Sequence, residues 1–337
     1  MPPLKCLAFT PGWNTPSSRF RVRQYVPELV SLGVQVTERA AAFGYVRPHR
    51  YWPLPLWGLA NIADRLIDVS DQGRFAGAII QREFLSTFYT VERLIRIPAV
   101  LDVDDAVWVK RNSNAIFRIA ARCRAVICGN EYIEEEFTRR GFKTYRLPTA
   151  VDTTRFSPGV RDSNLLVWTG TAGNLESLHL IEAALTRAFA KNPALRLRVV
   201  CDAAPRLSGI PAERLEYIPW SPAAEVETLR TAGVGLMPLD DNLFTRGKCS
   251  YKALLCMACG LPVVISPVGM NCVLATESSG VVLARSDEEW TEAVLSLSRD
   301  HAQAQRLGEQ NRKAVEERYA LSVLAQRLVA ILQQEFR

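Results

Sequence analysis

RGKCSYKALLCMACGLPVVISPVGMN, residues 246–271, runs from a small and basic start through a helical segment into a strongly apolar strand. The helix is expected to begin near Ser250, and the Gly-Leu-Pro at 260–262 ends it. Two lysines, Lys248 and Lys252, stand at the start of this helix. Strand–helix–strand units of this kind bind ligands beyond the carboxyl ends of their strands, so the stretch predicts a ligand site beside these amines.

Short apolar segments alternate with amphipathic helical segments along the whole chain, which predicts parallel sheets built from βαβ units. The first half contributes expected strands at 4–10, 34–38, 76–81, 99–105 and 125–130, and helices over 20–33 and from 131. The second half contributes strands at 164–170, 195–201, 215–219, 234–239 and 261–266, and a helix over about 176–192. Two such series predict two doubly wound domains that face each other, with the default ligand site in the cleft between them.

A chain of 337 residues is too long for one ordinary hydrophobic core. The Pro- and Asp-containing segment 147–159 is the expected linker. We therefore expect a Rossmann-like domain at 1–158, a second one at 159–318, and an amphipathic helix at 319–337 that crosses back to the first domain.

Charge is distributed unevenly between the two halves. Residues 1–158 contain 22 Lys and Arg against 15 Asp and Glu, a net charge of +7, whereas the other 19 basic and 20 acidic residues give −1. A basic first half indicates an anionic partner, such as a phosphorylated acceptor or an acidic membrane surface. A basic surface that is simply solvated fits the same numbers equally well.

Several protein classes are disfavoured by the sequence. No apolar run reaches the ~18 residues of a membrane span, and the N-terminus does not resemble a secretory signal, so we expect a cytoplasmic protein. The C-x-x-C at 256–259 lies in an apolar helix without a second pair, which favours packed thiols over zinc or redox chemistry. Only three histidines occur, and neither G-x-G-x-x-G after a strand nor a Walker A motif is present, so a His-based triad, a dehydrogenase and an NTPase are disfavoured, and no metal is expected.

The stretch 219–274 resembles the nucleotide-sugar half of glycosyltransferase family 4, the retaining enzymes with the two-domain GT-B fold, in a subgroup with an R-G-K-C-x-x-K pattern. LPTAVDTTRFSP at 147–158 is similar to the linker of this family, and SSRFR at 17–21 and the helix from Tyr319 extend the likeness over most of the chain. The resemblance implies transfer of a sugar from a nucleotide-diphosphate sugar to a hydroxyl of a polysaccharide, glycolipid or lipid-linked glycan precursor, without metal, cofactor or nucleic-acid partner.

Under this resemblance the helix that begins near Ser250 offers its positive end to the donor diphosphate. Lys248 and Lys252 add charge-assisted hydrogen bonds, Arg246 adds charge, and Gly247 permits close approach of the backbone. The alternative is that these lysines are ordinary solvated surface groups. We expect Lys248 and Lys252 to serve catalysis by neutralising the leaving diphosphate.

Two departures from the family pattern concern the donor. The family's pair of Glu residues corresponds here to Gly247 and Leu255, and leucine cannot accept a hydrogen bond from ribose. Donor contacts then fall to Lys248 and nearby backbone, or ribose is held elsewhere, or donor binding is weak. The Arg and Lys that relatives carry in the loop at 167–178 are replaced by Gly170, Thr171 and Asn174, whose amides and hydroxyls are expected to hold phosphate.

The remaining candidates lie at other strand ends. Gly12 and Arg19, in the loop after the first strand, are expected near the donor phosphates, with the alternative that Arg19, Arg21 and Arg23 are all surface charges. Trp220 is placed near the base, although aromatic packing is an equal alternative. LDVDDAVW at 101–108 contains D-x-D, but a metal-dependent single-domain protein does not explain the second βαβ series. We expect Asp104 or Asp105 to orient or deprotonate the acceptor hydroxyl, with Asp105 as the catalytic candidate and helix capping as its alternative.

Residues 43–66 interleave aromatic, proline and basic residues before an amphipathic run. Such a segment fits peripheral contact with an anionic membrane at its inner face, or a loop packed on the core. Two rival functions also stay open: a sugar-nucleotide epimerase on the same fold, and a catalytically degenerate partner subunit.

Overall fold

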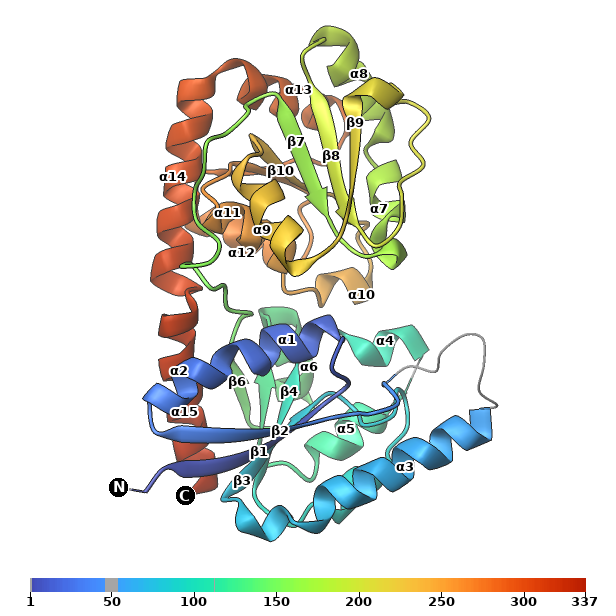
Figure 1. Cartoon of the computed structure of the whole chain (residues 1–337), viewed down its shortest axis with the longest axis vertical. Coiled ribbons are helices and arrows are strands. Elements are labelled where there is room, and N and C mark those ends of the chain that lie inside the picture. The colour runs from blue at the N-terminus through green and yellow to red at the C-terminus, as the bar shows by residue number, and fades with distance from the viewer. Residues whose placement is uncertain (1, 46–53, 112) are drawn as a thin grey trace. The chain divides into compact units, whose positions relative to one another are not determined.

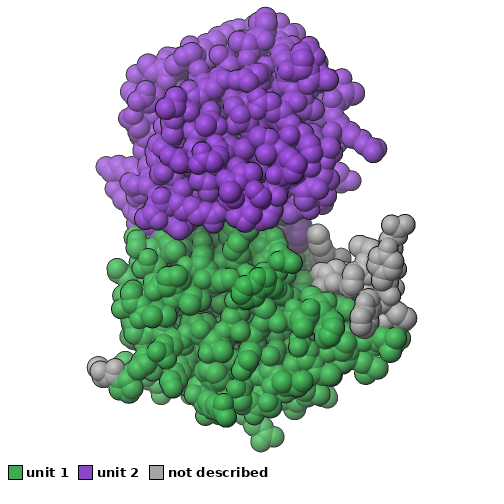
Figure 2. Space-filling model, in the orientation of Figure 1, with its two compact units in different colours: residues 1–150, 247–249, 321–337 green, residues 151–246, 250–320 purple. Residues whose placement is uncertain are grey.

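The computed structural model describes residues 2–45, 54–111 and 113–337 and divides into two compact units (Figure 2). Unit 1 comprises Met1–Ala150, Gly247–Cys249 and Leu321–Arg337, and unit 2 comprises Val151–Arg246 and Ser250–Ala320. The limits expected from the sequence, 158 and 318, lie a few residues from the observed ones. The assignment of 247–249 to unit 1 has no counterpart in the sequence pattern.

Unit 1 is built on a six-stranded parallel sheet in the order β2-β1-β3-β4-β5-β6 (Figure 1). Its strands are β1 (Leu4–Thr10), β2 (Val34–Ala40), β3 (Gly77–Gln81), β4 (Ala99–Val103), β5 (Ala125–Cys128) and β6 (Thr144–Arg146). The five strands predicted for this half are confirmed. The sequence missed β6 because its half-exposed Thr-Tyr-Arg offers no apolar run.

The helices of unit 1 cover both faces of this sheet. They are α1 (Pro16–Arg21), α2 (Val26–Ser31), α3 (Leu54–Ser70), α4 (Val107–Arg111), α5 (Ala115–Ala120), α6 (Glu131–Arg139) and α15 (Leu321–Phe336), with 3₁₀ turns η1 (Arg23–Tyr25), η2 (Gln72–Arg74) and η3 (Val91–Leu94). The single helix predicted over 20–33 is wrong. Val22, at φ −125°, ends α1, and Pro27 suits the first turn of the new helix α2 because it lacks an N–H group.

Unit 2 repeats the plan with the sheet order β12-β11-β10-β7-β8-β9, again all parallel. The strands are β7 (Leu165–Thr169), β8 (Arg196–Cys201), β9 (Leu215–Pro219), β10 (Val234–Met237), β11 (Val263–Ile265) and β12 (Val281–Leu283). The helices are α7 (Glu176–His179), α8 (Glu182–Lys191), α9 (Pro222–Arg230), α10 (Leu243–Arg246), α11 (Tyr251–Ala258), α12 (Met270–Glu277), α13 (Asp287–Arg299) and α14 (His301–Arg318), with turns η4 (Ala172–Asn174) and η5 (Ala212–Arg214). The helix predicted over 176–192 is divided at Ile181, whose φ of −119° is not helical.

The C-terminal helix α15 belongs to the core of unit 1. Its buried residues Leu324, Leu328 and Leu332 pack in one cluster with Cys6 and Val100 of the sheet. Chain ends are often loosely held, and here the apolar face of a 16-residue helix prevents that.

Glu335 fastens this helix to the edge strand β6. Its carboxylate, in a side chain only 5% exposed, accepts hydrogen bonds from Lys143 Nζ and Tyr145 Oη, both at 2.6 Å. Burial opposes ionisation, but these hydrogen bonds outweigh it and lower the pKa of Glu335 below its ordinary value of 4.5. A lowered pKa stabilises the fold above the ordinary value, and this contribution is lost as the pH falls through the folded-state pKa.

Glu335→Gln is therefore expected to reduce the free energy of unfolding by about 1–2 kcal/mol at neutral pH. The difference from the wild type should shrink on acidification, as urea titrations followed by circular dichroism at several pH values would show. Glu317→Gln is the control, because the exposed pair of Glu317 with Lys313 spans 3.9 Å and contributes little. An equal loss in both variants, or a loss that does not change with pH, would contradict the assigned role.

Candidate functional site

The strand order of unit 2 reverses between β7 and β10. From β7 the chain continues to β8 on one side, and it returns to place β10 on the other side. Ligands of doubly wound sheets bind at such a point, beyond the carboxyl ends of the two strands. Here β7 ends at Thr169 and leads directly to Gly170, and the segment that follows β10 leads to α11. The topology therefore places the predicted helix start at the switch point of its own sheet.

A buried hydrogen-bond network holds the start of α11. The Oγ of Ser250 donates to Oδ1 of Asn271 at 2.6 Å, and Nδ2 of Asn271 donates to the carbonyl of Ser266 at 2.8 Å. The Oγ of Ser266 in turn accepts from the amide of Leu239 at 2.9 Å. The network joins the segments that follow β10 and β11, so it fixes the helix start relative to the sheet edge.

Ser250 itself adopts a left-handed conformation, with φ +50°, and its side chain makes no capping hydrogen bond to α11. A non-glycine residue in this conformation costs free energy and often marks a functional position. Because the Ser250 hydroxyl donates to Asn271, it does not cap the first turn of α11. The positive end of this helix suits an anion.

Lys252, in the first turn of α11, lies beside the end of β7. Its Nζ stands 4.4 Å from the centre of the Trp168 ring, a cation–π arrangement that orients the amine. A Cβ added to Gly170 would lie 2.6 Å from this Nζ and 2.3 Å from the Trp168 ring. Gly170 is therefore required by close packing, and two candidates predicted from separate motifs, Lys252 and Gly170, lie together.

Gly170→Ala is expected to displace the Lys252 amine and weaken nucleoside-diphosphate binding at least ~10-fold, because the new methyl group overlaps both the ring and the amine. Calorimetric titration of the variant with the diphosphate measures this. Gly173→Ala in the same loop is the matched control, since a Cβ there meets nothing within 4 Å. Equal affinity in the two variants would show that the packing around Lys252 is not part of the site.

The other predicted residues of the Gly170 loop bond to one another. Asn174 Nδ2 donates to Thr171 Oγ1 at 2.8 Å. The amide of Ala172 donates to the carboxylate of Asp202 at 2.5 Å. No motif in the sequence points to Asp202, which follows β8. A phosphate held by this amide would have to displace Asp202, so the loop contributes less to an anion site than the start of α11.

Arg246 and Trp220 lie at other points of unit 2. Arg246 forms a two-pronged ion pair with Asp241, with distances of 2.7 and 3.1 Å, and this pair lowers the pKa of the Asp241 carboxyl. Its charge is therefore already balanced. Trp220 is half-buried at the end of edge strand β9, so β8 separates its strand from β7. Leu255, which the resemblance to glycosyltransferase family 4 aligns with a Glu, is buried with 1% exposure.

Gly247 and Lys248 make their contacts in unit 1. A Cβ on Gly247 would lie 2.5 Å from the Cβ of Ala106, and the carbonyl of Lys248 accepts from Asn130 Nδ2 at 3.0 Å. Gly247 is thus required by packing against unit 1, a reason that differs from the expected approach to phosphate. Lys248 and Lys252 belong to different units, and their joint action on one diphosphate, like a site between the units, stays a prediction.

A half-buried ionic cluster occupies the carboxyl edge of the sheet in unit 1. Arg82, directly after β3, pairs through Nε with Asp104 and through a terminal nitrogen with Asp105, both at 2.6 Å. Arg82 has φ +60°, an uncommon conformation for a side chain of this size. Burial raises the pKa of Asp105, and Arg82 and Lys248 act in the opposite direction. No local sequence pattern distinguishes Arg82.

Arg21 and Arg23, in the segment after Gly12, form ion pairs within unit 1. Arg21, 4% exposed, forms a buried ion pair with Asp102, and Arg23 pairs with Glu38 at 2.7 Å. The alternative that Arg19, Arg21 and Arg23 are all surface charges is therefore wrong. Arg19 is half-buried with its guanidinium 4.5 Å from the Phe20 ring centre, and Gly12 has φ +155° in the loop after β1. Both lie near the end of β1, and their phosphate contact stays a prediction.

Other features of the described residues fall outside this chemistry. Cys256 and Cys259 are buried free thiols, as predicted, and burial raises the pKa of Cys259 to about 12. No group of three or more His, Cys, Asp or Glu side chains in the described part of the chain could hold a metal ion.

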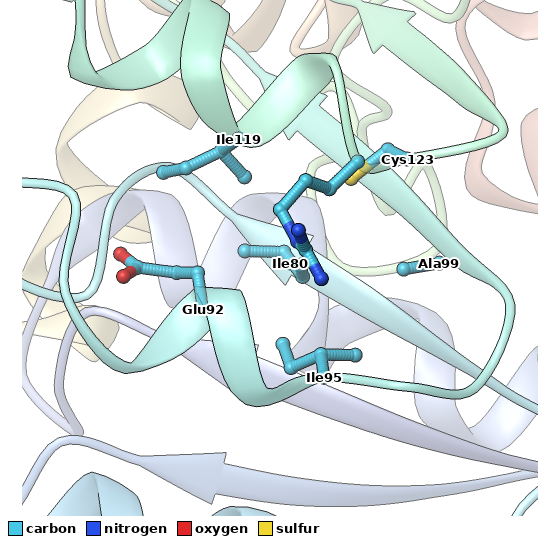
Figure 3. A pocket seen from close by; sticks show the side chains of 7 residues that line it. Ile80, Glu92, Ile95, Ala99, Ile119 and Cys123 are labelled. Atoms are coloured by element: carbon cyan, nitrogen blue, oxygen red, sulfur yellow. The ribbon is translucent and has the colours of Figure 1, made fainter.

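A small pocket among η3, β3, β4 and α5 is lined mainly by apolar side chains such as Ile80, Ile95 and Ile119 (Figure 3). Its one carboxylate, Glu92, already accepts from the amide of Phe84. None of the helices described is long and apolar enough to cross a bilayer.

The two parallel sheets define an α/β protein with the GT-B fold, two Rossmann-like doubly wound domains, as the sequence predicted. Sucrose-phosphate synthase from Thermosynechococcus elongatus superimposes with a TM-score of 0.74 at 15% identity, covering 98% of this chain and 99% of that one. HepE of Anabaena in complex with UDP and glucose gives 0.71 at 14% identity, covering 98% and 100%. An alpha-glucosyltransferase in complex with UDP and a mismatched DNA 13-mer gives 0.68 at 14% identity, covering 99% and 100%.

A family model matches part of the sequence of unit 2. Residues 163–300 match the family model described as Glycosyl transferases group 1. The matched region contains β7, the Gly170 loop, α11 and the Ser250–Asn271 network. No curated protein matches this chain.

Proposed function

We propose that the protein is a glycosyltransferase that moves a sugar from a nucleoside-diphosphate sugar to an acceptor hydroxyl with retention of configuration. The observation that carries the proposal is the Lys252 amine, oriented by Trp168 in the first turn of α11 and at the switch point of unit 2. The match of residues 163–300 to the glycosyl transferases model supports the same donor class.

The chemistry follows from where charge develops. As the glycosidic bond breaks, the leaving diphosphate gains negative charge, so a fixed amine and helix dipole directed at it lower the barrier. In this proposal Lys252 and the α11 amides hold the diphosphate, and Lys248 adds a second positive charge. Front-face attack by the acceptor needs no covalent nucleophile, and no metal or cofactor takes part.

Unit 1 is the proposed acceptor-binding unit. Asp105 is held by Arg82 at the carboxyl edge of its sheet, where a carboxylate can orient or deprotonate an acceptor hydroxyl. The basic character of this unit suits a phosphorylated or lipid-linked glycan precursor. We propose that the protein works in the cytoplasm, with peripheral contact to an anionic membrane when the acceptor is lipid-linked.

A panel of nucleotide sugars tests this proposal. UDP sugars come first because two of the similar structures contain UDP. Slow hydrolysis of one donor, with its anomer followed by NMR, supports a retaining transferase, and a DNA duplex belongs among the acceptors because one similar structure contains DNA. A donor epimerised without acceptor would indicate the epimerase instead. Absence of both turnover and diphosphate binding would overturn the assignment and leave the degenerate partner subunit, a function that the buried Leu255 favours.

A further inference from the structure

Helix α3 directs a row of apolar side chains toward solvent. Leu59 and Ile67 are 63% and 73% exposed, whereas Asn61 and Arg65 on the opposite side are 0% and 1% exposed. The exposed apolar residues of the helix share one face, because they recur at helical spacing: Leu56, Leu59, Ala63, Leu66 and Ile67. An ordinary surface helix presents polar residues to solvent opposite its buried apolar stripe, whereas α3 presents a second, exposed apolar stripe.

Polar contacts help to hold α3 on unit 1 in this orientation. The Nη1 of Arg65 donates to the carbonyl of Arg39 at 2.8 Å and to the carboxylate of Asp68 at 2.9 Å. Asp64 accepts from the amide of Ala42 at 3.0 Å. These partners, together with buried Trp57 and Val69, face the interior. The exposed apolar stripe therefore adds nothing to the core of unit 1.

The surroundings of this stripe are basic. Arg74 in η2 and Arg93 and Arg96 in and after η3 are exposed, and none of the three forms an ion pair with another described residue. Turn η3 packs against α3 through its buried side. The acidic residues between 54 and 96 instead accept hydrogen bonds from groups of unit 1: Asp64, Asp68, Asp71, Glu83 and Glu92. Apolar and positive groups thus face outward together, and negative groups are engaged within the unit.

We propose that this α3 surface, defined as the apolar stripe with Arg74, Arg93 and Arg96, docks on an anionic lipid bilayer. A helix that lies in the membrane interface inserts its apolar face, and neighbouring arginines attract anionic headgroups. The described residues of unit 1 contain 22 Lys and Arg against 15 Asp and Glu, a net charge of +7, whereas 17 against 20 in unit 2 give −3. This asymmetry turns unit 1 toward a negative surface.

A second copy of the chain is the less favourable occupant. Two copies joined through the α3 surface would bring arginines of like sign near each other, which opposes association. The basic and aromatic residues at 46–53 lie outside the described residues, and the proposal does not use them. It specifies the surface for the membrane contact proposed above, and it is tested without donor or acceptor, so its failure is distinguishable from failure of the transferase assignment.

Flotation of the full chain with vesicles tests the proposal. Binding to phosphatidylcholine vesicles that contain phosphatidylglycerol is expected, with little binding to phosphatidylcholine alone and weakening at high salt. The pair Leu59→Ser and Ile67→Ser should weaken binding at least ~10-fold, and Arg93→Gln with Arg96→Gln should weaken it several-fold. These side chains are exposed, so thermal unfolding should be unchanged. The matched control is Leu180→Ser with Val160→Ser in unit 2, where the side chains are 49% and 93% exposed.

Three results would overturn the proposal. The first is failure of the wild type to float with phosphatidylglycerol vesicles. The second is an equal loss of binding in the control pair, which would mean that exposed apolar groups bind lipid without regard to place. The third is a wild-type dimer in light scattering that the Leu59→Ser and Ile67→Ser pair dissociates, because a second copy would then cover the stripe.

Discussion

Lys252→Ala should weaken binding of a nucleoside diphosphate at least ~100-fold and reduce turnover by a similar factor. The amine lies in the first turn of α11, directed by the Trp168 ring beside Gly170, so its loss removes the charge without opening the core. Adding Lys248→Ala should abolish both donor affinity and turnover. Isothermal titration with the diphosphate, together with thermal unfolding of each variant, measures the two effects separately.

Two further variants separate charge from other causes. Lys252→Met keeps most of the side chain's length and loses the amine, so it should behave as Lys252→Ala does if the charge is what matters. Lys191→Ala removes an exposed lysine of unit 2 that pairs with Glu292 and should leave binding unchanged. Wild-type affinity for nucleoside diphosphate in the double variant of Lys248 and Lys252 would refute the assigned site.

The position of Lys252 was predictable because its signals are local. A lysine at a helix start opposes the helix dipole, and the glycine that ends the helix stands in the same 26-residue stretch as the lysine. The strands were predictable for the same reason, since each buried strand is a continuous apolar run. Short strands such as β12 escaped because three residues carry no periodicity.

The partners of the charged side chains were not predictable, because these contacts join residues far apart in the sequence. Arg21 and Asp102 are separated by 81 positions, and Ala172 and Asp202 by 30. Nothing in the segment SSRFR at 17–21 shows that Arg21 is buried in an ion pair. Arg19, two positions earlier, stays a candidate for phosphate binding. The same applies to Gly247, whose packing against Ala106 follows from the fold alone.

Arg82 is the clearest case, and it leads to the second large expected effect. Asp105→Asn should lower kcat by about 10²–10⁴-fold if Asp105 deprotonates the acceptor, while diphosphate binding in unit 2 persists. Calorimetry and initial rates on the same preparation distinguish these outcomes. A variant with unchanged kcat would limit Asp105 to the helix-capping alternative.

The charges around Asp105 predict how the activity depends on pH. Burial raises the pKa of Asp105 above its ordinary value of 3.8, Arg82 and Lys248 lower it, and Asp104 raises it. A base acts in its ionised form, so activity falls as the pH drops through this pKa. Arg82→Gln should move the acid limb of the kcat/KM profile to higher pH, and Asp104→Asn should move it to lower pH. Arg82→Lys keeps the charge and should stay close to the wild type. If Arg82, Asp104 and Asp105 had only a structural role, each variant would lose activity without a shift of the acid limb. Profiles of kcat/KM against pH that keep the wild-type acid limb would therefore exclude Asp105 as the base.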